Sequence, residues 1–171
     1  MDKLIIKEMQ QDKVTIDRIG LLAPYLRHEA GNIYREIGEA LKGRAIIRFS
    51  HTWRSFDEQN KLYAIGRSVP GKKVTNAKGG DSYHNYGLAI DIVLLVDKDK
   101  NGTFESASWE NNVDFDGDGQ ADWMEVVAIF KKYGWEWGGD WKFSDTPHFQ
   151  KTGGQTIASL KKSYPKGWQP S

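Results

Sequence analysis

Apolar residues in the first quarter of the chain recur at helical spacing. A separation of three or four residues places side chains on one face of a helix. From Thr15 to about Lys42 the pattern predicts two helical stretches that end at Gly43, with interruptions at Pro24 and Gly31. The positions that form the pattern are Ile16, Ile19, Leu22, Leu26, Ile33, Ile37 and Leu41. The next residues, RAIIRFS at 44–50, are strong β formers and predict a short strand.

The most apolar run of the chain is GLAIDIVLLV at residues 87–96. Both of its faces are apolar, which predicts a central strand. Asp91 lies inside this run. Moving a carboxylate from water into a protein interior costs roughly several kcal/mol, so a buried one needs compensation. Asp91 is therefore expected to face either a cation, such as Arg44 or Arg48, or a bound metal ion.

Local signals predict the remaining elements. Ser55 and Glu58 form a capping box, which indicates that a helix begins after Ser55. The proline and glycines of residues 67–82 are typical of a loop. Residues 121–134 are expected to form a helix whose inward residues are Trp123, Val126, Val127 and Phe130.

Short strands are expected near both ends of the next segment, at WEW (135–137) and HFQ (148–150), and a last short helix is expected before Pro165. The elements together predict an α+β fold in which helices pack on a small, central, mainly antiparallel sheet. We expect a single domain over residues 1–171, with an acidic loop insertion at about 97–120.

Composition narrows the class of protein. A chain of 171 residues with 39% apolar residues suffices for one sizeable core, and we expect a monomer. The net charge of +1 offers no electrostatic footprint for nucleic acid. No segment is apolar enough to span a membrane, and residues 1–20 do not resemble a secretory signal, which leaves the route of export open. Because the chain has no cysteine, histidines and carboxylates must hold any metal.

Two histidines accompany Asp91 at positions that suit a metal site. His84 lies before a bend expected at Gly87, so its side chain and that of Asp91 can converge from a loop and a strand. His148 stands in SDTPHFQ, where a loop enters a short strand. Two histidines and one carboxylate are a known set of catalytic zinc ligands that leaves a fourth position for water. Taken singly, each residue also fits an ordinary surface or ion-pairing role.

Three segments carry a family resemblance: HTWRSFDEQNKLYAIGR (51–67), SYHNYGLAID (82–91) and WEWGGDWKFSDTPHFQ (135–150). In this order they resemble the M15 family of zinc peptidases, above all its cell-wall L-alanyl-D-glutamate endopeptidases from bacteria and phages. The resemblance implies a Hedgehog and D,D-peptidase type of zinc fold. It also implies hydrolysis of a peptide bond in peptidoglycan stem peptides, in the bacterial cell wall or periplasm, as by an endolysin.

The resemblance also assigns roles to residues. It implies one catalytic zinc held by His84, Asp91 and His148. It makes Asp145 the general base and acid, and Arg54 the cation that binds the substrate carbonyl. These roles agree with the chemistry, because zinc lowers the pKa of bound water to about 7, a carboxylate takes up its proton and a guanidinium stabilises an oxyanion. Without the three motifs, Asp145 would be interpreted as a turn residue and Arg54 as an ion-pair partner at its helix start.

Two positions depart from the family pattern and leave the fine specificity open. His51 is an additional histidine, and Gln150 stands where many relatives carry an acid. Candidate substrate contacts near the motifs are Ser82, Asp140, Trp137 and Trp141. The alternatives are that the tryptophans cover the sheet and that Asp140 is a loop carboxylate or orients a zinc-bound histidine.

A second metal signal lies in DFDGDGQADWME, residues 114–125. The segment matches the calcium-loop template, in which side chains, one backbone carbonyl and a final glutamate supply oxygen ligands. The expected ligands are Asp114, Asp116, Asp118, Gln120 and Glu125. We predict a structural calcium ion, with a solvated acidic turn as the alternative. The similar segment at 97–108 ends in Ser108 rather than a glutamate, and it is expected to be a turn or a weak site.

Two other functions stay open from the sequence. The first is a D,D- or L,D-carboxypeptidase of the same family, which should carry a further cation for the terminal carboxylate of its substrate. The second is a wall-binding or signalling module that keeps zinc without catalysis. Arg54 and Asp145 argue against the second, because a pure binder has no need of either residue.

Overall fold

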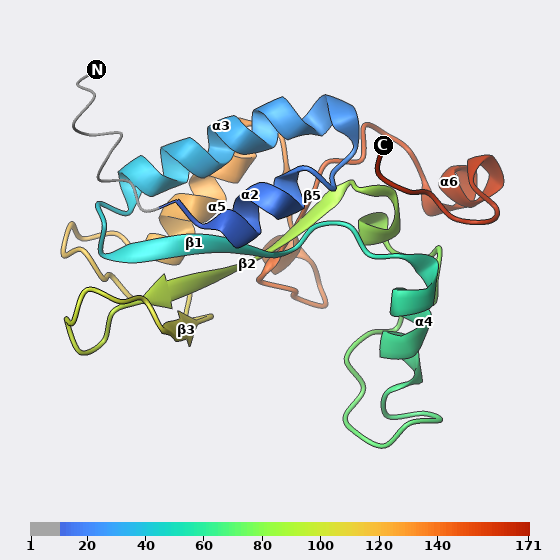
Figure 1. Ribbon diagram of the computed structural model, residues 1–171, viewed down its shortest axis with the longest axis horizontal. Coiled ribbons are helices and arrows are strands. Elements are labelled where there is room, and N and C mark those ends of the chain that lie inside the picture. Colours follow the sequence, from blue (N-terminus) through green and yellow to red (C-terminus); the bar gives the residue numbers. More distant parts are fainter. Residues whose placement is uncertain (1–10) are drawn as a thin grey trace.

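The computed structural model describes residues 11–171 (Figure 1). Residues 1–10 lie outside the described residues. They are the first half of the segment 1–20, which is not expected to be a secretory signal. None of the described helices is long and apolar enough to cross a membrane. In chain order the elements are α2 (Lys13–Ile19), α3 (Pro24–Ala40), β1 (Ala45–His51), α4 (Phe56–Ala64), η1 (Tyr83–Tyr86), β2 (Ala89–Val96), β3 (Ser106–Ser108), α5 (Asp122–Lys132), β4 (Glu136–Trp137), η2 (Gly138–Asp140), β5 (His148–Gln150) and α6 (Ile157–Ser163).

All strand pairs of the sheet are antiparallel, and the strand order is β1-β2-β5-β4. The short strand β3 pairs with the last residues of β2, whereas β5 pairs with its first residues. β2 is therefore central, as its two apolar faces predict. The register places Asp91 between two partners, opposite His51 on β1 and opposite His148 on β5. Strand β3 was not expected, because the surrounding segment is polar; Ala107 pairs with Leu95 at the end of β2, and Ser108 is buried there.

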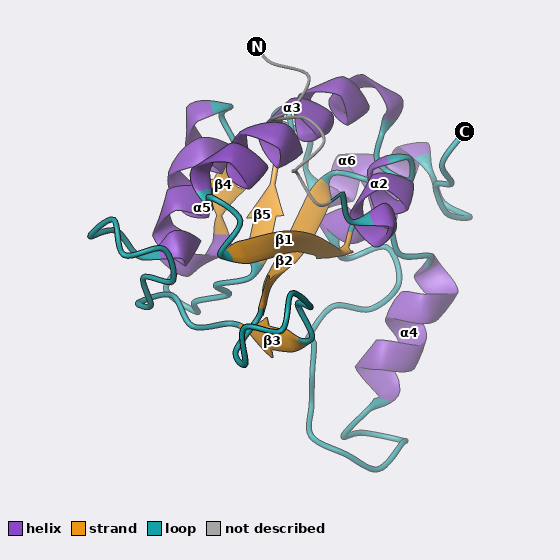
Figure 2. Cartoon of the chain, turned by 60° about the vertical axis from the view of Figure 1, so that its left-hand side comes forward, coloured by secondary structure: helices purple, strands orange, loops and turns teal. Residues whose placement is uncertain are grey.

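Helices α2, α3 and α5 pack with the sheet into one core (Figure 2). All four inward residues expected on α5 are at most 2% exposed, which confirms the helical period of that segment. Phe130 of α5 stacks on Phe149 of β5, with ring centroids 4.0 Å apart. The expected interruption at Gly31 is wrong, since α3 continues through it. Ala30 and Ile33 are fully buried on either side, and their burial outweighs the cost of about 1 kcal/mol for a glycine in a helix.

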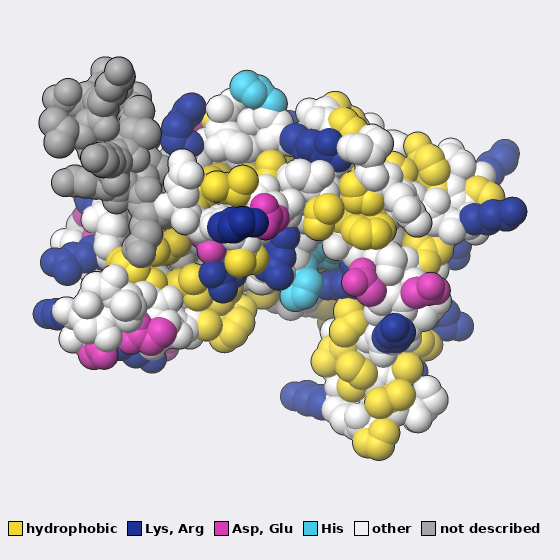
Figure 3. Space-filling model, in the orientation of Figure 1, with side chains coloured by type: hydrophobic (Ala, Val, Ile, Leu, Met, Phe, Trp, Pro, Cys, Tyr) yellow, Lys and Arg dark blue, Asp and Glu magenta, His cyan; other side chains and the backbone are white. Residues whose placement is uncertain are grey.

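Helix α4 and the loop that follows it project from the rest of the molecule (Figures 1 and 2). The expected capping box begins this helix: the Ser55 hydroxyl accepts from the Glu58 backbone N–H at 3.1 Å, and the Glu58 carboxylate accepts from the Ser55 backbone N–H at 2.8 Å. The space-filling view shows a hollow between this projection and the main body, with histidine and basic side chains at its inner end (Figure 3). The projection thus forms one wall of a cleft.

Candidate metal centre and active site

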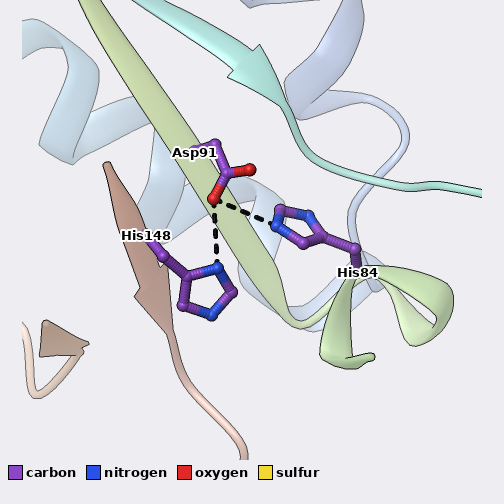
Figure 4. Close-up of side chains that lie close together, drawn as sticks. All are labelled: His84, Asp91 and His148. Carbon is purple, nitrogen blue, oxygen red and sulfur yellow. Dashed lines mark hydrogen bonds and ion pairs between the residues drawn. The ribbon is translucent and has the colours of Figure 1, made fainter. Parts of the chain in front are cut away.

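His84, Asp91 and His148 meet at one point (Figure 4). The Oδ1 atom of Asp91 lies 3.1 Å from Nε2 of His84 and 3.0 Å from Nδ1 of His148. The three side chains come from η1, β2 and β5, which are separated widely along the chain. Both histidines are buried, with 3% and 7% exposed. The structure therefore brings together the two histidines and the carboxylate expected to share an ion.

A tight turn lets His84 and Asp91 converge. The single turn η1 is capped by Ser82, whose hydroxyl accepts from the His84 backbone N–H at 3.3 Å. Gly87 ends the turn in the left-handed region, with φ 67°. A Cβ at this position would lie 2.6 Å from the backbone nitrogen of Ala23, so only glycine fits there. The turn directs His84 back over the start of β2, toward Asp91.

The contact of Nδ1 with the main chain determines the tautomer of His84. Nδ1 lies 2.8 Å from the carbonyl oxygen of Thr52, which can only accept, so Nδ1 carries the hydrogen. Nε2 is then a bare lone pair that is buried without a hydrogen-bond partner and directed at Asp91. A buried polar atom without a partner is costly, and a cation removes that cost. Imidazole nitrogens and a carboxylate oxygen are the donors that zinc prefers, so the three residues fit this ion.

His148 is held in the same manner from its other side. Its Nε2 lies 2.9 Å from Oε1 of Gln150, and Nε2 of Gln150 donates to Glu136 at 3.0 Å. Because an amide oxygen only accepts, Nε2 of His148 carries a hydrogen, and Nδ1, which lies 3.0 Å from Oδ1 of Asp91, is the nitrogen that would offer a lone pair to a bound ion. Outer partners of this kind orient metal ligands. The sequence marked Gln150 only as a departure from a family pattern, and the structure gives it this contact.

Protonation of the central carboxylate is governed by its neighbours. Burial opposes the charge on Asp91, but the positive charge and the hydrogen bonds of protonated His84 and His148 outweigh it and hold the pKa of Asp91 far below its ordinary value. The Asp91 side chain therefore stays an anion, and a bound cation would take the place of the imidazole protons beside it. Arg48, one of its alternative partners, pairs instead with Asp12 at 2.8 Å.

A cleft of about 510 Å³ opens onto the three residues and is lined by Arg54 and Asp145 as well. The Arg54 guanidinium donates from Nη1 to Oε1 of Gln59 at 2.9 Å, and burial lowers its pKa. Asp145 is fixed through its backbone, whose N–H donates to the carbonyl of Gly138 at 2.9 Å. Desolvation in the cleft raises the pKa of the Asp145 carboxyl and outweighs the opposing effect of His148, while the charge of Asp91 adds to the rise. The cleft thus places two groups beside the cluster of His84, Asp91 and His148: a cation, and a carboxyl group suited to proton transfer.

Two comparisons with known proteins bear on this site. A family model described as D-alanyl-D-alanine carboxypeptidase, of the M15 peptidases, matches residues 75–151 and spans the histidine and aspartate cluster. The peptidoglycan L-alanyl-D-glutamate endopeptidase CwlK of Bacillus subtilis (strain 168) is 45% identical over 124 residues, which cover 69% of this chain and 71% of that protein. The chain belongs to the M15 peptidase family. Its α+β fold, with a small antiparallel sheet and packed helices, is confirmed by this membership.

In this M15 peptidase the buried group of His84, Asp91 and His148 is consistent with a zinc site. Of the candidate substrate contacts, the structure brings two to the cleft, namely Ser82 and Trp141. The other two lie elsewhere. Asp140 pairs with Lys131 at 2.8 Å, and Trp137 is 9% exposed and donates its indole N–H to the Thr146 carbonyl at 2.7 Å.

Sequence analysis missed one residue that supports a side chain of the cleft and left the role of another open. Gln59 is 1% exposed and holds Arg54, although it stands in an ordinary polar stretch of α4 that carries no local signal. His51, whose role the sequence left open, lines the cleft with Arg54, and desolvation together with the charge of Arg54 lowers the pKa of its imidazole.

Proposed function

We propose that this M15 peptidase hydrolyses the L-alanyl-D-glutamate bond in the stem peptide of bacterial peptidoglycan. One zinc ion would be held by Nε2 of His84, the carboxylate of Asp91 and Nδ1 of His148. The observation that carries the proposal is the unpartnered, buried Nε2 of His84, directed at Asp91 within a cleft that also holds Arg54 and Asp145. The 45% identity to a peptidoglycan L-alanyl-D-glutamate endopeptidase supports the choice of substrate.

Zinc in such a site supplies Lewis-acid polarisation and a water of lowered pKa. The side chain of Asp145 takes the proton of the attacking water and returns a proton to the leaving amine. Its raised pKa suits this double role, because acid–base catalysis is most efficient when the pKa of the group lies close to the working pH. The Arg54 guanidinium donates to the substrate carbonyl oxygen and stabilises the negative charge that develops there.

Endopeptidase action is favoured over the carboxypeptidase alternative by the charges of the cleft. A carboxypeptidase needs a cation for the terminal carboxylate of its substrate in addition to the one at the scissile carbonyl. Among the residues that line the cleft in the described chain, Arg54 is the one lysine or arginine. The lysines of the loop after Arg67, which were candidates from the sequence, do not line it. We therefore infer that the bound peptide continues past the cleft on both sides of the scissile bond.

The site of action inferred from this substrate is the bacterial cell wall or periplasm, whether the peptidase serves as a phage endolysin or in wall remodelling. The proposed mechanism assigns no step to calcium in the acidic loop.

Mass spectrometry of digested peptidoglycan tests the proposal. Purified peptidoglycan is incubated with the protein, with the chelated protein, and with the chelated protein after zinc is restored. We expect fragments with a new N-terminal D-glutamate that disappear on chelation and return with zinc. Release of terminal alanine alone would identify a carboxypeptidase, and uncut peptidoglycan from several chemotypes with zinc still bound would identify a binding module.

A further inference from the structure

The acidic loop at 114–125 gathers carboxylates that the peptidase reaction does not use. They form two groups that share Asp116, and within each group one carboxylate oxygen of every residue lies within 4.8 Å of the others. The first group consists of Asp114, Asp116 and Asp122, and the second of Asp116, Asp118 and Glu125. The loop leads directly into α5, whose first turn contains Asp122 and Glu125.

Several of these oxygens are buried without a partner. The side chain of Asp116 is 1% exposed, and its Oδ2 has no hydrogen bond. Asp122 is fully buried and its Oδ2 is likewise unpaired, as is Oε2 of Glu125. Unpaired buried carboxylate oxygens are costly, and neighbouring negative charges raise the cost. Such a cluster is expected to be completed by a cation.

The nearest cation supplied by the described chain does not complete the cluster. Nζ of Lys42 lies 3.5 Å from Oδ2 of Asp118 and 4.0 Å from Oδ2 of Asp116. The lysine side chain is 59% exposed, so solvent screens its charge. It stands at the rim and leaves Asp122 and Glu125 without compensation.

Two carboxylates of the loop use one oxygen each to hold the backbone. In Asp116 one oxygen accepts from the backbone N–H of Asp118 at 3.1 Å, which leaves Oδ2 free. In Asp122 one oxygen accepts from the backbone N–H of Phe115 at 3.0 Å, and again Oδ2 is free. Gly119, at the sixth position of the template, makes the sharp turn with φ 89°. Each of these carboxylates therefore uses one oxygen to hold the loop and offers the other.

We propose that residues 114–125 bind one calcium ion. A cluster made of oxygens alone excludes zinc as the preferred ion, and the number of carboxylates exceeds the one or two that magnesium normally takes. The ligands would be the carboxylates of Asp114, Asp116, Asp118 and Glu125 and the backbone carbonyl of Gln120. Asp122, at the ninth position of the template, joins them directly or through water. The sequence had predicted this set without Asp122.

The ion would join the loop to the core that supports the active site. Glu125 belongs to α5, and Phe130 of the same helix stacks on Phe149, the neighbour of His148. Binding to the folded loop alone stabilises the native state by mass action. Calcium is therefore expected to raise the melting temperature of the peptidase without entering its reaction.

The neighbouring loop at 97–108 has a similar turn and provides a matched control. Gly102 N–H donates to Asp97 at 2.8 Å, as Gly119 N–H does to Asp114. Its acidic group of Asp97, Asp99 and Glu105 is largely exposed, and we assign it no ion. Asp99→Asn therefore removes a comparable carboxylate outside the proposed site.

Isothermal titration of calcium chloride into the zinc-loaded protein tests the proposal. The variants Asp116→Asn, Glu125→Gln and Asp99→Asn are titrated in the same way. We expect one calcium per chain, a melting temperature that rises with calcium, and an affinity at least about tenfold weaker in Asp116→Asn and in Glu125→Gln but unchanged in Asp99→Asn. Both site variants relieve charge repulsion, so they should fold without calcium. The proposal is overturned if the wild-type protein takes up no calcium at millimolar concentration, or if both site variants bind as the wild type does. Zinc content, measured in parallel, separates this result from failure of the peptidase proposal.

Discussion

Nη1 of Arg54 donates a hydrogen bond of 2.9 Å to Oε1 of Gln59, a side chain that is 1% exposed. The amide of Gln59 donates in turn to the carbonyl of Ala77 at 2.9 Å, in the loop that lines the cleft. One buried glutamine thus joins the proposed oxyanion-binding cation to the wall of the projecting segment. A guanidinium fixed in advance stabilises developing charge better than one that must first be ordered.

Gln59→Leu should lower kcat by about tenfold or more and change KM less, because Arg54 loses the acceptor that orients it. The zinc content should stay at the wild-type value. The unpaired partners should also cost about 1 to 3 kcal/mol of stability. Gln59→Glu keeps an acceptor for Arg54 and serves as the control. Equal kcat in Gln59→Leu and wild type would show that the contact does not support catalysis.

Asp145→Ala should keep the fold and the bound zinc, but its hydrolysis rate should fall by a factor of about 10² to 10⁴, because the proposed proton acceptor is removed. Asp145 is tied to the fold through its backbone, which the substitution preserves. Circular dichroism, zinc analysis and peptidoglycan digestion would be measured on one preparation. Full activity in this variant would remove Asp145 from the mechanism.

Gly138→Ala should impair the same step from a distance. A Cβ at residue 138 would lie 2.4 Å from the carbonyl oxygen of Asp145, so the backbone of that residue must move. We expect reduced kcat with bound zinc retained. Gly31→Ala is the control, because nothing lies within 4 Å of its Cβ and the helix should gain up to about 1 kcal/mol. Identical kinetics for the two variants would argue against a role for the close approach at Gly138.

Gln150→Leu should weaken zinc binding by about 10- to 100-fold, because Nε2 of His148 loses its acceptor. Competition with a chromogenic chelator measures this affinity without any assay of hydrolysis. Glu136→Gln is the comparison, since it keeps a partner for the Gln150 amide while removing a charge. Unchanged zinc affinity in Gln150→Leu would show that the contact is dispensable for the metal.

Asp12→Asn should destabilise the protein by about 1 to 3 kcal/mol at neutral pH, because it disrupts the pairing with Arg48. Burial raises the pKa of Asp12, but hydrogen bonds from Arg48 and Thr15 outweigh it and leave the pKa below the ordinary value. The stabilisation is therefore complete above the pKa of the unfolded state and is lost as pH falls through the lower pKa of the folded state. Urea unfolding of both proteins, from about pH 7 to about pH 2, should show their stabilities converging in acid. A constant difference across this range would contradict the assignment.

The sequence by itself determined most of the secondary structure and the residues of the candidate metal centre. Helical periodicity, the Ser55 capping box and the apolar run around Asp91 are local signals, and the corresponding elements are present. The buried aspartate already required a partner, because its charge cannot be left uncompensated. The spacing of residues in the acidic loop likewise predicted the proposed calcium ligands, apart from Asp122.

Only the tertiary structure decided which atoms face one another. Asp91 and His148 are 57 residues apart, and the pairing of β2 with β5 sets them opposite each other. The tautomer of His84 depends on the carbonyl of Thr52, 32 residues away, and the Gln150 amide that faces His148 is itself bonded to Glu136 on β4. Gln59 is close to Arg54 in the chain, but its amide also donates to the carbonyl of Ala77, 18 residues away. The ion pair of Asp140 with Lys131 and the hydrogen bond of the Trp137 indole to Thr146 likewise cannot be predicted from the sequence. Local patterns specify what a segment can form, whereas side-chain contacts arise from the global packing of segments distant along the chain.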